Sequence, residues 1–146
     1  MGTWYRYAPA VVAWALLAAC GGGGDGAMTD PLGASQTVVL RAGAVVAVGT
    51  GALTLKLTDV RDSRCPVDAT CVWAGHASVA VQATYTGQAA QSAWVGLQAS
   101  AGADLPGDAY VHGWRLRLQA LEPAPRAGVE VPLEQYRATV VAERTQ

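Results

Sequence analysis

The chain has 146 residues, of which 51% are hydrophobic and 14% are charged, and its ten Lys and Arg against eleven Asp and Glu give a net charge of −1. Such a length allows one modest hydrophobic core. Because the charge is near neutral and no basic run occurs, the composition argues against nucleic acid as a partner. Phenylalanine is absent, so we expect an aliphatic core with Trp and Tyr as its largest members.

Residues 1–19 have the pattern of a secretory signal peptide. A single charge, Arg6, precedes an apolar run over residues 8–19. This run is too short to span a bilayer, which needs about 20 apolar residues, but it fits a signal-peptide core of roughly 7–15 residues. We therefore expect residues 1–19 to be removed on secretion.

The tetrapeptide LAAC, residues 17–20, ends this run and resembles the lipobox of bacterial lipoproteins. The resemblance implies that Cys20 carries diacylglycerol and begins the mature chain, and that more than one acyl chain makes the membrane attachment stable. An ordinary signal peptide with a chance cysteine is the alternative. Gly21 stands where lipoproteins kept at the inner membrane carry Asp, which favours the outer membrane, on its periplasmic side.

Residues 20–35 are predicted to be a lipidated cysteine followed by a flexible tether. The run GGGGDGAMTDPLGAS, residues 21–35, has no apolar periodicity and has the composition of a linker. A coil of this length would hold the following domain on the order of 20 Å from the membrane. Residues 36–146 are then predicted to form a single β-domain.

Period-two alternation after the tether predicts strands with one buried face. The clearest cases are LTLKL (53–57), SVAVQATY (78–85) and WRLRLQA (114–120). Further strands are predicted for TVVLR (37–41), AVVAV (44–48), SAWVGL (92–97) and YRATVVAE (136–143). No ten-residue window predicts an amphipathic helix. The expected fold is all-β, an antiparallel β-sandwich or open barrel of about seven strands.

The connection SRCPVDATCVWAG, residues 63–75, is the most distinctive run. With one cysteine assigned to lipid, Cys65 and Cys71 should form a disulfide in an oxidising compartment. Pro66 fixes one backbone angle, and Asp68 can bond back to the main chain in a turn. Closing so small a ring contributes about 2 kcal/mol, so the disulfide is expected to shape a loop more than to hold the fold.

The side chain of Trp73 has two possible roles. If the alternation of residues 78–85 runs back unbroken, Cys71 and Trp73 face inward and the indole packs beside the disulfide. Gly75 could interrupt that phase as a bulge. The other role is that of an aromatic edge beside a rigid loop, which receives a ligand or a partner.

These cysteine-containing segments also carry a family resemblance. DSRCP (62–66) and CVWAG (71–75) resemble a group of small secreted or lipid-anchored bacterial β-domains that have D-S-R-C-P, a short gap and C-x-W-x-G. Segments 116–128 and 134–142 look like the closing strands of that group. The resemblance covers most of residues 40–143 and implies a fold and a compartment. It implies no mechanism, because the group has no assigned activity.

We expect no catalytic residues and no cofactor. The motifs GxSxG and HExxH, a P-loop and a dinucleotide fingerprint are all absent from the sequence. A structural zinc site needs four Cys or His ligands, and a thioredoxin-like site needs CxxC near a βαβ unit. The sequence contains neither pattern.

A metal site built from other residues is the alternative hypothesis. The candidate ligands are two isolated histidines, His76 and His112, and three carboxylates around the cysteine loop, Asp59, Asp62 and Asp68. A carboxylate cluster could hold calcium, although turn-forming Asp residues beside arginines explain the same pattern without a metal.

The function predicted from the sequence is non-catalytic binding or scaffolding at the cell envelope. The membrane is reached through the N-terminal lipid, and an envelope protein is the expected partner. A short loop closed by a disulfide suffers a small ordering cost on binding, as protease-inhibitor loops do. The candidate contact residues are Asp62, Arg64, Pro66, Asp68 and Trp73. A periplasmic metal-binding protein is the alternative.

Overall fold

A computed structural model describes residues 34–97 and 106–145 of the chain. These residues form two antiparallel four-stranded sheets that are not closed into a barrel, which confirms the predicted β-sandwich. The signal peptide, Cys20 and nearly all of the tether lie outside the described residues. No helix within the described part is long and apolar enough to cross a membrane.

Four consecutive strands form one sheet, and the first strand of the chain joins the last three in the other sheet. One sheet has the order β1-β8-β7-β6, with β1 at Ser35–Arg41, β8 at Arg137–Arg144, β7 at Trp114–Glu122 and β6 at Ala109–Val111. The other has the order β2-β3-β4-β5, with β2 at Val45–Val48, β3 at Leu53–Asp62, β4 at Ala77–Tyr85 and β5 at Gln91–Gly96. All seven predicted strands are present, and the three-residue β6 is additional.

The core lies between the sheets and is aliphatic, as expected. Leu residues from β3 and β7 and Val residues from β4 and β8 are almost fully buried. Ser78, which the alternation of residues 78–85 places on the outer face of the sheet, is nevertheless buried, with an exposed fraction of only 3%. On that outer face, Arg61 stacks 4.1 Å over the ring of Trp94, and both are cross-strand partners of β4 residues. Alternation in the sequence predicts which residues face the core, but it cannot show that side chains also bury the outer face of β4.

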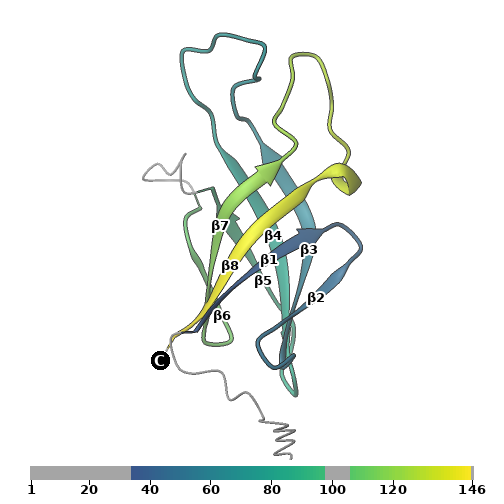
Figure 1. Cartoon of the computed structure of the whole chain (residues 1–146), viewed down its shortest axis with the longest axis vertical. Coiled ribbons are helices and arrows are strands. Elements are labelled where there is room, and N and C mark those ends of the chain that lie inside the picture. Colours follow the sequence, from purple (N-terminus) through teal and green to yellow (C-terminus); the bar gives the residue numbers. More distant parts are fainter. Residues whose placement is uncertain (1–33, 98–105, 146) are drawn as a thin grey trace, which may run out of the picture.

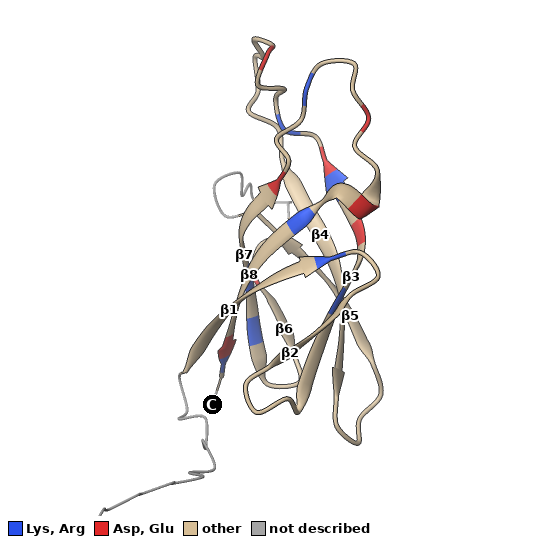
Figure 2. Ribbon diagram, turned by 45° about the vertical axis from the view of Figure 1, so that its right-hand side comes forward, with Lys and Arg blue, Asp and Glu red and all other residues tan. Residues whose placement is uncertain are grey.

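The two ends of the sandwich differ. Two long connections, β3 to β4 and β7 to β8, project side by side from one end (Figure 1). The second of them contains a short 3-10 helix, Leu133–Gln135. At the other end β1 begins and β8 finishes, with Ser35 paired to Glu143. Figure 2 shows acidic and basic residues together at the loop-bearing end. The chain therefore enters the domain at the end opposite to the two loops.

Candidate binding surface at the loop end

Asp62 and Arg64 form a nearly buried ion pair where β3 runs into the cysteine loop. Arg64 donates from Nε to Oδ1 of Asp62 at 2.8 Å and from Nη2 to Oδ2 at 2.6 Å. Only 3% of the Asp62 side chain and 17% of the Arg64 side chain are exposed. Bidentate pairing of this kind fixes geometry as well as charge. These two predicted contact residues are therefore internal to the loop.

Arg64 also joins the two projecting connections. Its Nη1 donates to the carbonyl of Leu121 at 2.8 Å, and its Nη2 donates to the carbonyl of Pro123 at 2.9 Å. Both carbonyls lie where β7 gives way to the second connection. One guanidinium thus neutralises a buried carboxylate and satisfies two backbone acceptors of another segment.

Two further hydrogen bonds link the connections toward their tips. The amide of Val67 donates to the carbonyl of Pro125 at 3.0 Å. The amide of Ala127 donates to Oδ1 of Asp68 at 2.8 Å. Asp68 was expected to bond within its own loop, but it instead holds the neighbouring one. The two connections, residues 63–76 and 123–136, are therefore held to each other by hydrogen bonds. We call them together the clamped unit.

The predicted disulfide between Cys65 and Cys71 is confirmed, with the two Cα atoms 5.9 Å apart. Inside the ring, the amide of Ala69 donates to the carbonyl of Pro66 at 3.1 Å and closes a turn. The amide of Cys65 donates to the carbonyl of Ala74 at 2.9 Å. Both stems of the loop are thereby held together next to the ring.

The inward orientation considered for Trp73 is wrong, because 82% of this residue is exposed. Strand β4 begins only at Ala77, and Gly75 has a φ of +74° that breaks the alternation between them. Its Cα lies so close to the other stem that an added Cβ would fall 1.9 Å from the Ser63 carbonyl oxygen. The second possibility, an aromatic edge beside a rigid loop, is the one the structure has.

Exposed apolar side chains gather on the clamped unit. Four of the seven large hydrophobic residues that are exposed in the described part belong to it, namely Val67, Val72, Trp73 and Val129. Val72 is 93% exposed. Exposed apolar groups on one end of a domain are candidates for an interaction site. We call these four residues the loop-tip apolar surface. Of these four, only Trp73 was among the predicted contact residues. Val67 and Val72 lie in the same run, whereas nothing in the segment around Val129 predicts that it belongs to the same end of the domain.

The candidate metal ligands are not brought together. Asp59 accepts from the amide of Val60, whereas the other two carboxylates hold the clamped unit. His76 lies immediately before β4, and its carbonyl accepts from the amide and hydroxyl of Ser63. His112 occupies the β6–β7 turn at the opposite end (Figure 1). Within residues 34–97 and 106–145, no three His, Cys, Asp or Glu side chains group so that they could hold an ion.

Tyr136 completes the base of the clamped unit. Its hydroxyl donates to Oδ2 of Asp62 at 3.4 Å. Burial, and then the negative charge of Asp62, raise the pKa of Tyr136 above its ordinary value of 10.0. The phenol is therefore held neutral beside the carboxylate.

This shift predicts a loss of stability in alkali. A raised folded-state pKa gives stability that is fully present below the unfolded pKa and is lost as pH rises through the folded one. We expect the free energy of unfolding to fall above about pH 10, and to fall less steeply in Tyr136→Phe. Urea unfolding across this pH range measures both slopes. Equal slopes would mean that ionisation of Tyr136 is not linked to folding.

Comparisons with protein-family models, with curated proteins and with solved structures found no match.

Proposed function

We propose that this chain is a lipid-anchored lipoprotein of the bacterial cell envelope, whose non-catalytic β-domain binds a partner protein through the loop-tip apolar surface. The observation that carries the proposal is the exposure of Trp73 on a loop that is closed by a disulfide and clamped to its neighbour. Tryptophan is among the residues that most often dominate the energy of protein interfaces.

The rigidity of the loop supports a binding role. Association costs free energy for every side chain and loop that must be ordered. Here the disulfide, the Arg64 contacts and the hydrogen bonds from Val67 and Ala127 order the backbone before any partner arrives. A partner would meet a preformed surface.

The point at which the chain enters the domain supports a particular orientation of the domain relative to the membrane. The chain enters the domain at Ser35, opposite to the two projecting loops (Figure 1). With Cys20 acylated in the periplasmic leaflet of the outer membrane, the tether would allow the loop-tip apolar surface to face away from that membrane. An envelope protein in the periplasm is then the natural partner.

The anchor is tested by Cys20→Ser. The variant should lose labelling by a radioactive or alkyne-tagged fatty acid, because its hydroxyl does not replace the thiol in thioether formation. It should also leave the membrane fraction or remain unprocessed. Unchanged labelling and fractionation would remove the lipoprotein part of the proposal.

The binding surface is tested by photo-crosslinking in the native envelope. A photoreactive residue at Val72 should give a discrete protein adduct, and one at Tyr110, which is 67% exposed on β6, is the matched control. Trp73→Ala should remove the Val72 adduct, since loss of an interface tryptophan typically costs about 2 kcal/mol or more of binding.

The same variant separates binding from folding. Because Trp73 is mostly exposed, Trp73→Ala should change the free energy of unfolding by less than about 0.5 kcal/mol. An adduct pattern that is the same at both positions, or that survives Trp73→Ala, would contradict the proposed surface.

A further inference from the structure

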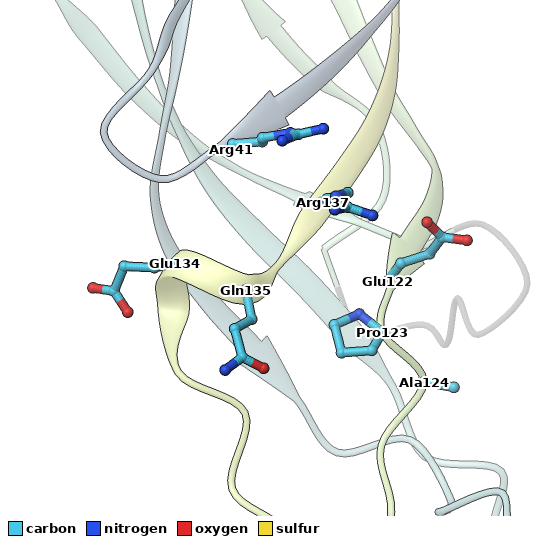
Figure 3. Close-up of a pocket in the computed structure, with 7 residues that line it drawn as sticks. All are labelled: Arg41, Glu122, Pro123, Ala124, Glu134, Gln135 and Arg137. Carbon is cyan, nitrogen blue, oxygen red and sulfur yellow. The ribbon is translucent and has the colours of Figure 1, made fainter.

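A second site lies on the outer face of the β1-β8-β7 sheet, where these strands meet the second connection. It is an open pocket of about 620 Å³. Arg41, Arg137 and Glu122 form its sheet side, while Pro123 and Gln135 lie beside it (Figure 3). None of these five residues belongs to the loop-tip apolar surface.

The strand register places three charged residues in one row across this pocket. Arg41 pairs with Arg137 between β1 and β8, and Arg137 pairs with Glu122 between β8 and β7. Like charges directly opposite each other destabilise a sheet. Two adjacent arginines are therefore a cost to the fold that a bound anion would offset.

The other two arginines on this sheet face, Arg115 and Arg117, have carboxylate partners, in contrast to Arg41 and Arg137. Arg115 contacts Asp108, and Arg117 lies 3.9 Å from carboxylate oxygens of Asp108 and Glu143. In the described part of the chain, the guanidinium groups of Arg41 and Arg137 have no hydrogen-bond or ion-pair partner. In Figure 3 both side chains extend in the same direction over the pocket.

The surrounding charges define the kind of anion. Two guanidinium forks suit a carboxylate, whereas Glu122 at the end of the row repels a polyanion. Glu122 can instead accept an ammonium group. Neighbouring strands lie about 4.8 Å apart, so the row from Arg41 to Glu122 spans roughly two strand spacings.

We propose that this pocket binds a small zwitterion, with its carboxylate on Arg41 and Arg137 and its ammonium group on Glu122. A molecule the size of a dipeptide matches the span of the row. The pocket volume falls within the range of about 300–1,000 Å³ that small-molecule sites occupy. The site is independent of the proposed partner surface, so the two can fail separately.

The test is a titration of the mature lipidated chain in a non-ionic detergent, followed through the arginine Nε–Hε signals by NMR. The probes are glycylglycine, acetate, ethylammonium and inorganic phosphate. Glycylglycine should bind about tenfold more tightly than acetate, as one added charge-assisted contact predicts. Tighter binding of phosphate than of glycylglycine, or no saturable shift with glycylglycine, would overturn the proposal.

Variants assign the two halves of the ligand. Arg41→Gln and Arg137→Gln should each weaken glycylglycine and acetate about tenfold or more. Glu122→Gln should lower glycylglycine affinity to that of acetate and leave acetate unchanged. Arg144→Gln, at the far end of β8, removes the same charge outside the pocket and should change neither affinity.

The outcome is readable because the three pocket residues are exposed and their replacement should leave the core signals in place. Affinities that are unchanged in all three pocket variants, or reduced equally by Arg144→Gln, would show that the probes bind elsewhere or respond only to net charge. Either result overturns the assignment.

Discussion

Replacing Arg64 by Ala should lower the free energy of unfolding by about 3 kcal/mol, as expected when one partner of a nearly buried ion pair is removed. The variant leaves the carboxylate of Asp62, only 3% exposed, without its bidentate partner. It also removes the donors to the carbonyls of Leu121 and Pro123. Denaturant unfolding followed by tryptophan emission measures the loss.

Arg126→Ala is the matched control, because Arg126 is an exposed arginine on the second connection. Its replacement should change stability by no more than about 0.5 kcal/mol. A double-mutant cycle with Asp62→Ala isolates the pair, and the double variant should lose less than the sum of the two single losses. Equal effects of Arg64→Ala and Arg126→Ala would contradict the clamping role of Arg64.

The sandwich could be predicted from the sequence because its strands alternate. Leu53, Leu55 and Leu57 are buried and are separated by Thr54 and Lys56, which are only partly exposed. A period of two is a local property, so it is visible without knowing any partner strand. The disulfide could be predicted from the three cysteines, since setting Cys20 aside for a lipid leaves one pairing for an oxidising compartment.

The loop end could not be predicted to the same extent, because it is built from contacts distant in the sequence. Arg64 reaches carbonyls 57 and 59 positions away, and Asp68 holds an amide 59 positions away. Asp62 and Arg64 therefore looked like surface groups when they are largely buried braces, and the exposed Asp68 braces the neighbouring connection. Trp73 was open to two interpretations, since a single glycine decides whether the strand phase carries back to it.

The residues of the DSRCP and CVWAG segments, 62–66 and 71–75, have different roles in the structure. Asp62 and Arg64 brace the two connections, and Cys65 and Cys71 close the loop. Trp73 neither braces nor closes the loop, and 82% of it is exposed. A large apolar side chain exposed on a braced loop has no evident use in folding, and our proposal of a binding role starts from this exposure.

Gly75 is the position in this run where the smallest change should have the largest effect. In Gly75→Ala the new methyl group would lie 1.9 Å from the carbonyl oxygen of Ser63 and 2.8 Å from the Cα of Arg64. The stems cannot simply separate, because the amides of Ser63 and Cys65 donate to the carbonyls of His76 and Ala74 across them. Relief of the clash must break these bonds or move Arg64 away from Asp62.

We therefore expect Gly75→Ala to cost on the order of 2–4 kcal/mol. Gly128→Ala is the control, since Gly128 has a similar φ of +69° but open space around its Cα, and it should cost only the left-handed strain of about 1–2 kcal/mol. If the clash acts by displacing Arg64, Gly75→Ala should cost less in an Arg64→Ala background than in the parent chain. Equal costs of the two glycine variants would mean that the stems accommodate the methyl group, and the close approach of Gly75 to Ser63 would then not be what holds Trp73 outward.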